Sequence, residues 1–172
     1  MIRVPDPAEY APFYKTYISL VPAGNLLTIL DDQCEKTRFL LANVDEGDAD
    51  NRYGPDKWSV KEVVGHIIDT ERIMAYRALR VSRNDTTPLP GFEQDDFVRS
   101  GPYANCELTS LLEEFHCVRR STILMFSHML PEAFDRGGTV DNKRITVRAL
   151  AHIIAGHEIH HRQILRERYL GR

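Results

Sequence analysis

Residues 146–169 read TVRALAHIIAGHEIHHRQILRERY, and this stretch indicates the fold more clearly than any other. Its apolar residues recur every three or four positions, which predicts one long amphipathic helix. His157 and His161 share the apolar face, and a spacing of four places their Cβ atoms about 6 Å apart. Both imidazoles could therefore bind one metal ion. The residues of this face are Leu150, Ile153, Ile154, His157, His161, Ile164 and Leu165.

The same stretch satisfies the pattern H-E-x-x-H, which zinc proteases use with the glutamate as general base. Those enzymes take a third ligand from further along the chain, and residues 162–172 match neither of the usual continuations. They also bind peptides against a sheet edge, and no long strand is predicted here. The pattern therefore favours a different kind of metal site over a protease.

Three further amphipathic segments precede this helix, at about 25–44, 59–81 and 107–130. Ser59 and Glu62 form a capping box, which predicts that the second of them starts at Ser59. A short helix is expected over 7–20, a polar loop over 45–57, and a small hairpin over 131–145 around Asp141-Asn142. The predicted fold is all-α: a four-helix bundle formed by a single domain, residues 1–172.

The connection between the second and third bundle helices, residues 83–105, is unusually long and contains three prolines and two glycines. A helix of about 22 residues is about 33 Å long, and 23 residues of connection can cover that distance. The two helices are therefore expected to run parallel, joined by a crossover. The resulting order is up-down-down-up.

A catalytic metal site of this kind usually takes three protein ligands, and His66 is the best candidate for the third. It lies seven residues after Ser59, about 10 Å along its helix. In the up-down-down-up order the second and fourth helices are antiparallel, which brings His66 to the height of His157 and His161. His160 could replace His161 as the partner of His157.

Composition excludes several classes of protein. Hydrophobic residues make up 42% and charged residues 27% of the 172 residues, with a net charge of −3, as in ordinary globular proteins. No basic surface for nucleic acid or membrane lipid is indicated. Because neither a signal segment nor CxxC spacing is recognised, a cytoplasmic protein with reduced thiols is expected. Each cysteine is interpreted as a small buried residue: Cys34, Cys106 and Cys117.

Two motifs about 90 residues apart resemble one known family. WSVKEVVGHIIDTER (58–72) and AHIIAGHEIHHRQI (151–164) are similar to the second and fourth helix signatures of the DinB/YfiT-like metalloenzymes. TPLPGFEQD (87–95) also resembles one of its subgroups. The resemblance covers essentially the whole chain after the N-terminal segment.

This resemblance implies a divalent metal ion, Zn²⁺ or Ni²⁺ above all, bound by His66, His157 and His161, in a protein that is frequently a homodimer. The resemblance also implies a type of reaction. Some relatives are S-transferases or isomerases that depend on a low-molecular-weight thiol such as bacillithiol or mycothiol. A metal ion held by three neutral imidazoles keeps its +2 charge and can activate a thiol or a water molecule at neutral pH. The expected function is thiol S-transfer on a small-molecule substrate.

Two alternatives remain open at this point: a metal-dependent hydrolase, and a non-catalytic stress-related or interaction protein with a structural metal ion. Among neighbouring residues, Glu158 is interpreted as a solvated or supporting carboxylate rather than a general base, and Asp69 could orient a ligand ring. Trp58 is interpreted as a hydrophobic staple. The other histidines are expected to have surface or structural roles: His116, His128 and His152.

Overall fold

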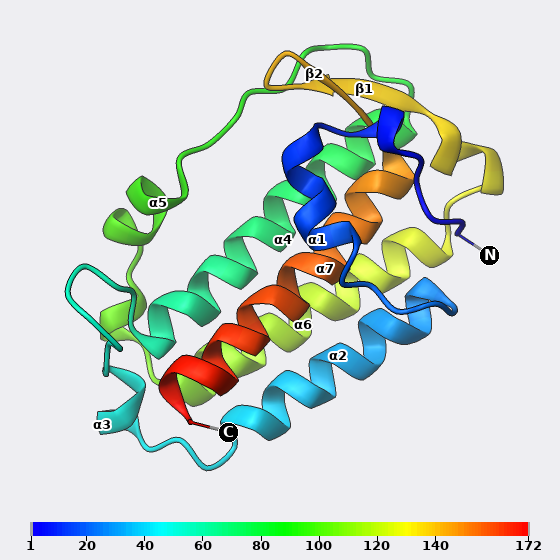
Figure 1. Cartoon of the computed structure of the whole chain (residues 1–172). Helices are drawn as coiled ribbons and strands as arrows, with labels where there is room; N and C mark the ends of the chain where they lie inside the picture. The colour runs from blue at the N-terminus through cyan, green and yellow to red at the C-terminus, as the bar shows by residue number, and fades with distance from the viewer. Residues whose placement is uncertain (1, 172) are drawn as a thin grey trace.

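The computed structural model describes residues 2–171, and its frame is four long helices. Helix α4 contacts both α6 and α7, and α2 contacts the same two helices, so the four form a closed bundle. Helices α4 and α6 run parallel, and α2 and α7 run opposite to them (Figure 1). The predicted up-down-down-up four-helix bundle is confirmed, with helices α2 (Leu26–Leu41), α4 (Val60–Ser82), α6 (Leu108–Ser127) and α7 (Val147–Ile164).

Local sequence signals explain where these helices begin. The Ser59 hydroxyl accepts a hydrogen bond from the Glu62 amide at 3.2 Å, and the Glu62 carboxylate accepts one from the Ser59 amide at 2.7 Å. The predicted capping box thus starts α4 where expected. Asn25 and Thr146 cap α2 and α7 in a simpler way, each accepting from backbone amides of the first turn.

The crossover runs the length of the bundle, as predicted, but it is not a plain loop (Figure 1). It contains α5 (Gln94–Ser100) and a 3-10 turn at Tyr103–Asn105. At its start, Leu89 pairs with the hairpin strand beside it, because its amide donates to the Thr139 carbonyl at 2.9 Å. Further along, α5 and the 3-10 turn both contact α4, so the connection is packed against the rest of the protein near both of its ends.

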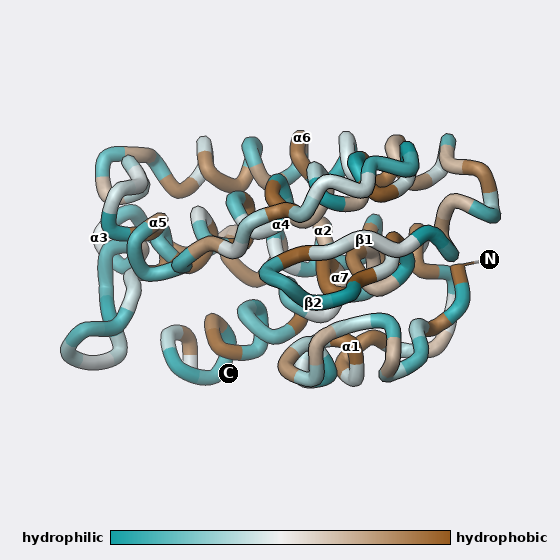
Figure 2. The backbone as a smooth tube through the Cα atoms, turned by 90° about the horizontal axis from the view of Figure 1, so that it is seen from above, coloured by the Kyte–Doolittle hydropathy of each residue, from teal (hydrophilic) through white to brown (hydrophobic). Residues whose placement is uncertain are grey.

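The expected hairpin forms from β1 (Gly137–Val140) and β2 (Lys143–Thr146), which pair antiparallel. Asp141 and Asn142 both adopt positive φ, the geometry that a two-residue hairpin turn requires. Figure 2 shows the hairpin from above, where it lies over α7 between α1 and α4.

Three boundaries differ from the sequence-based expectation. Residues 7–20 form two 3-10 turns followed by the single-turn helix α1 (Lys15–Ile18), because prolines interrupt the segment. The polar loop 45–57 contains the one-turn helix α3 (Glu46–Ala49). Helix α7 ends at Ile164 and continues as a π-turn, Leu165–Tyr169.

Two apolar clusters fill the bundle, one toward each end. The first includes Met74 and Ala78 of α4 with Phe126 of α6. The second includes Val63 and Ile67 of α4 with Phe115 and other residues. Between them lies a layer of buried polar side chains contributed by all four helices: Gln33, Thr37, His66, Thr70, Glu71, Arg119, Thr122, His157, Glu158 and His161. The candidate site belongs to this layer.

None of the helices among residues 2–171 is long and apolar enough to cross a membrane. That residues 1–172 form a single domain stays a prediction.

Candidate metal centre

Three histidines meet between the antiparallel helices α4 and α7. The Nε2 atoms of His66 and His157 lie 3.0 Å apart, and each residue offers a ring nitrogen within 4.8 Å of those of the other two. All three side chains are buried. The fold therefore places His66 at the same height along the bundle as His157 and His161, as predicted. Beyond the His66–His157 contact, these rings form no hydrogen bond with residues 2–171.

The cluster carries no charge at neutral pH. Burial lowers the pKa of His66 to about 4, and the nearby His160 lowers it further. Burial also holds the pKa values of His157 and His161 well below their usual range, with neighbouring histidines adding to the effect. Neutral imidazole is the form that binds a metal ion, so the folded protein presents three lone-pair donors ready for a cation.

Aromatic rings border the histidines on two sides. The Trp58 ring lies 4.7 Å from that of His66 and 6.4 Å from that of His161, so it covers the cluster. The hydrophobic-staple interpretation of Trp58 missed this contact. Tyr17 of α1 lies 5.2 Å from the His157 ring and 5.4 Å from that of His160.

Gly156 explains how Tyr17 comes so close. A Cβ atom at position 156 would lie 2.0 Å from the Tyr17 carbonyl oxygen, so only glycine lets the α1 backbone pack directly on α7. The N-terminal segment is thereby held over His157. Sequence analysis did not identify Tyr17, because this contact depends on tertiary packing.

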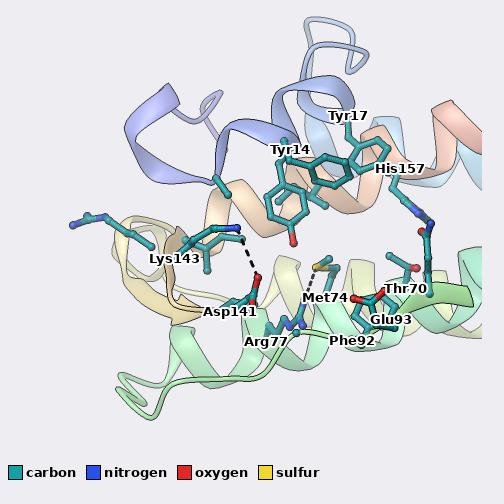
Figure 3. A pocket seen from close by; sticks show the side chains of 18 of the residues that line it. Tyr14, Tyr17, Thr70, Met74, Arg77, Phe92, Glu93, Asp141, Lys143 and His157 are labelled. Carbon is teal, nitrogen blue, oxygen red and sulfur yellow. Dashed lines mark hydrogen bonds and ion pairs between the residues drawn. The ribbon is translucent and has the colours of Figure 1, made fainter. Parts of the chain in front are cut away.

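A pocket of about 330 Å³ extends from the histidines toward the hairpin. His66 and His157 lie in its wall, followed along α4 by Thr70, Met74 and Arg77 (Figure 3). The crossover and the hairpin supply the rest of the lining, with Asp141 toward the hairpin and Glu93 nearer Thr70 (Figure 3). The volume is in the range of small-molecule sites.

Two residues with polar side chains line the pocket and were not identified from sequence: Thr70 and Glu93. Thr70 is buried one turn after His66, and its hydroxyl has no hydrogen-bond partner among residues 2–171. A helix threonine usually satisfies its hydroxyl on the preceding turn. Glu93, at the start of α5, is exposed and lines the same pocket. The only feature of the sequence that could have identified Thr70 is its position four residues after His66, which places both residues on one face of α4.

Glu158 and Asp69 lie outside this pocket. Glu158 is fully buried, accepts from Thr37 and, at 2.8 Å, from Arg162, and lies on the side of α7 that faces α2. It is therefore buried and ion-paired: of the two expected roles, the solvated one was wrong, and the supporting one stays a prediction. Asp69 accepts a hydrogen bond from Tyr103 and forms none with His66, so the possibility that it orients a ligand ring finds no support.

The remaining histidines occupy the expected kinds of position. His116 and His128 are exposed, and His152 is buried with its Nδ1 atom 2.9 Å from the Arg148 carbonyl oxygen. His160 is only partly buried and lies beside Tyr17, outside the group of three whose nitrogens converge.

The cysteines lie away from the pocket. Cys34 is buried, as predicted, but Cys106 is half-buried and Cys117 is exposed, because Cys117 falls on the outer face of α6. Cys34 approaches His116 at 3.5 Å and forms a second cluster with Glu35. Burial raises the pKa of Cys34 to about 11, so its thiol stays protonated and this cluster is the weaker metal-binding candidate.

The bundle topology and the histidine cluster define the class of protein. Residues 29–165 match the DinB superfamily, and the chain belongs to that superfamily. The resemblance drawn from the two helix motifs is thus confirmed. No curated protein matches the sequence.

A solved structure shows the same fold. YfiT from Bacillus subtilis, described as a probable metal-dependent hydrolase with an unusual four-helix bundle topology, superposes with a TM-score of 0.75. The match covers 86% of this chain and 90% of that one, at 15% sequence identity. At this identity the likeness establishes the arrangement of helices, including the parallel pair joined by the crossover.

Proposed function

We propose that His66, His157 and His161 bind one divalent metal ion, Zn²⁺ or Ni²⁺, and that the protein is a metal-dependent enzyme acting on a small molecule. The observation that carries this proposal is the convergence of three buried, neutral imidazoles at the end of a pocket. Three nitrogens bound tetrahedrally at about 2.0–2.1 Å lie about 3.3–3.5 Å apart. The observed separations, 3.0 Å for one pair and within 4.8 Å for all, fit this requirement.

The chain's own residues shape the reaction space around that ion. When bound, the ion would supply a Lewis acid that favours the deprotonated form of a thiol or a water molecule at neutral pH. Trp58 and Tyr17 limit access of water to the histidines. The unpaired Thr70 hydroxyl can donate to or accept from a group placed beside His66.

Thiol S-transfer is our first proposal for the reaction. None of the three cysteines lines the pocket, so the thiol would come from a low-molecular-weight cosubstrate. Its proton would pass to solvent, its sulfur would form a bond to an electrophilic carbon, and the leaving group would depart with the electron pair of the broken bond. The pocket has room for such a small molecule.

Hydrolysis is the second candidate, and two observations favour it. YfiT, which shares the fold, is described as a probable metal-dependent hydrolase. The pocket also contains Glu93, a carboxylate able to accept a proton from an attacking water molecule. Thiol transfer has less need of such a base, because a thiol is far more acidic than water.

Metal analysis tests the site. The purified protein should contain about one divalent ion per chain, and His157→Ala should lower metal affinity by more than about hundredfold, because two imidazoles remain of three. His160→Ala is the matched control, since His160 lies on the same turn but outside the cluster. A wild-type protein that binds no metal, or a His157→Ala variant that binds it normally, would refute the proposal.

Turnover assays with Glu93→Gln separate the two reactions. Thiol transfer, assayed with a panel of thiols and electrophiles, should be nearly unchanged in this variant. Ester or amide hydrolysis should fall by about 10²–10⁴-fold if Glu93 is the base. A metal-loaded protein that is inactive in both assays would favour a non-catalytic, metal-stabilised role.

We also propose that the protein forms a homodimer. Light scattering on the purified protein tests this proposal, because it measures the molar mass in solution.

A further inference from the structure

The pocket has a second polar end on the same face of α4 as His66. Residues 66, 70, 74 and 77 are separated by four, four and three positions, so their side chains share one face of the helix. All four line the pocket (Figure 3). His66 and Arg77 are separated by about 16 Å of helix axis, and the long Arg77 side chain leans back toward the helix N-terminus. The two polar ends are therefore on the order of 10 Å apart.

Arg77 is a buried cation without a salt bridge: Tyr14 and Asp141 are near enough to raise its pKa, but the effect of burial is larger and lowers that pKa. Its side chain belongs to a residue only 4% exposed, yet no carboxylate of residues 2–171 lies within 4.0 Å of its guanidinium. It donates to the Pro90 carbonyl at 2.7 Å and contacts the Met74 sulfur at 3.5 Å. The Phe92 ring lies 5.6 Å away. A guanidinium has five N–H donors, so most of its capacity is unused.

The other buried cations of the described chain show how unusual this is. Arg119 is paired with Glu71 at 2.8 Å, Arg148 with Glu9 at 2.6 Å, and Lys61 with Glu46 at 3.0 Å. Burial of an ion is strongly unfavourable unless it is paired. These three satisfy that requirement within the protein, and Arg77 does not. Burial accordingly lowers the pKa of Arg77, whereas ion pairing raises the pKa values of Arg119 and Arg148.

The surroundings of Arg77 are suited to an anion. Lys143 and Arg144 of β2 line the same end of the pocket and are exposed. The carboxylates that line the pocket are Asp141, which pairs with Lys143 at 3.7 Å, and Glu93, which lies nearer Thr70 (Figure 3). Over the whole lining, three cations thus outnumber two carboxylates. The Tyr14 side chain lies close enough for the guanidinium to affect its pKa, which burial raises, and its hydroxyl can donate to an anion.

A purely structural role for Arg77 explains less. The bond to Pro90 does attach the crossover to α4. One neutral donor would suffice for that bond, whereas the arrangement buries a full positive charge in the wall of a pocket.

We propose that Arg77 binds the anionic group, a carboxylate or a phosphate, of the small molecule whose reacting end lies at the histidine cluster. The second half of this statement rests on the proposed function. Tyr14 and Lys143 assist by hydrogen bonding and by attraction, and Phe92 covers the guanidinium. The substrate class is therefore an acid about 10 Å long, with its reactive centre opposite the charged group.

Three matched probes test this proposal on the full-length protein loaded with zinc: 6-mercaptohexanoate, 6-mercaptohexyl phosphate and 6-mercaptohexanol. All carry a thiol on a chain of six carbons, so their relative affinities, measured by calorimetry, report chiefly the opposite end of the probe. At least one acid should bind about tenfold or more tightly than the alcohol, since a charge-assisted hydrogen bond in a buried site replaces an unpaired charge. Which acid binds better distinguishes carboxylate from phosphate substrates.

Substitutions test whether Arg77 causes the preference for the acids over the alcohol. Arg77→Met, which keeps an unbranched side chain about as long as the arginine stem but removes the charge, should bring the acid and alcohol affinities within about twofold of each other, and Arg77→Lys should retain part of the difference. Arg99→Gln, an exposed arginine of α5, should behave as the wild type. A merely structural arginine would lower stability in Arg77→Met and leave the acid preference unchanged.

The outcomes separate this inference from the proposed function. Equal binding of acids and alcohol by the wild type, or a preference that survives Arg77→Met, overturns the role of Arg77 whatever the metal content. A wild type that binds no metal but prefers acids through Arg77 overturns the metal site and leaves the anion site standing. Zinc content measured in the same samples decides between these cases.

Discussion

The two halves of the buried polar layer differ in how completely their groups are paired. On the α2–α6 side, Arg119 is bonded to both carboxylate oxygens of Glu71, to the Gln33 side chain and to the Leu30 carbonyl. On the α4–α7 side, the three histidines contact chiefly one another, and the Thr70 hydroxyl has no partner.

This difference separates stability from function. A polar group whose hydrogen bonds are all made within the protein contributes to a unique packing arrangement, but has little capacity for a ligand. A buried group left without partners is costly, and is retained where a ligand completes it. The first half of the layer should therefore be sensitive in unfolding experiments and the second half in binding experiments.

The largest expected effect is at Arg119, whose guanidinium is fully paired. Glu71→Gln removes the counter-charge of Arg119, a residue only 1% exposed, and should lower the free energy of unfolding by about 3–5 kcal/mol. Urea denaturation measures this change. Glu114→Gln is the control, because its pair with Arg72 is partly exposed and should contribute less than about 1 kcal/mol. Similar losses in the two variants would contradict the contrast drawn here.

Burial of the three histidines should make the free energy of unfolding of the metal-free protein depend on pH. The folded protein holds the pKa of His66 at about 4, whereas an unfolded chain has histidines near 6.5. Between these values the unfolded chain binds protons that the folded, metal-free protein does not, so stability falls as pH decreases from about 6.5 to about 4. For His66 alone the loss at pH 5 is about 2 kcal/mol relative to pH 7.

Urea denaturation of the metal-free protein at pH 7 and pH 5 tests this expectation, with His128→Gln as an exposed-histidine control. Adding metal ion at pH 7 should raise the free energy of unfolding by an amount that grows with the logarithm of the ratio of metal concentration to Kd. A free energy of unfolding that is the same at both pH values would mean that the three histidines are not buried as described.

Much of this site could be predicted from sequence because it depends on helix register. The capping box fixes the height of His66 on α4, and the i, i+4 spacing fixes His157 and His161 on α7. The pocket could not be predicted in the same way. Arg77 shares a face of α4 with His66, but the pocket that joins them is enclosed by α1, the crossover with Glu93 and the hairpin, and no local pattern specifies that packing. The direction of Glu158 was missed for the same reason, since Thr37 lies 121 positions away.

Gly156→Ala tests whether the packing of α1 completes the site. The new methyl group would lie 2.0 Å from the Tyr17 carbonyl oxygen, so the α1 backbone must move, at a cost of about 1–3 kcal/mol. Metal content should persist, because the three histidines belong to α4 and α7. Small thiols should bind more weakly as Tyr17 leaves His157. Gly47→Ala is the control, since no atom lies within 4 Å of its added Cβ.

If metal content fell together with thiol binding in Gly156→Ala, the histidine cluster itself would depend on α1. The site could then no longer be described as a product of two helices with a separately assembled pocket. Metal analysis and calorimetry on the same preparation distinguish the two results.

The smallest effect on stability, and the finest test of the comparison, is expected at Thr70. Thr70→Val replaces a hydroxyl that has no partner among residues 2–171, so the free energy of unfolding should change by less than about 0.5 kcal/mol. Thr122→Val is the matched control, because that buried hydroxyl donates to the Val118 carbonyl at 3.0 Å and its loss should cost about 1 kcal/mol. Binding of 6-mercaptohexanoate should show the reverse order: weaker by several-fold in Thr70→Val, as one hydrogen bond to the ligand disappears, and unchanged in Thr122→Val. A Thr70→Val variant that loses stability but binds the probe normally would place Thr70 among the structural members of the layer.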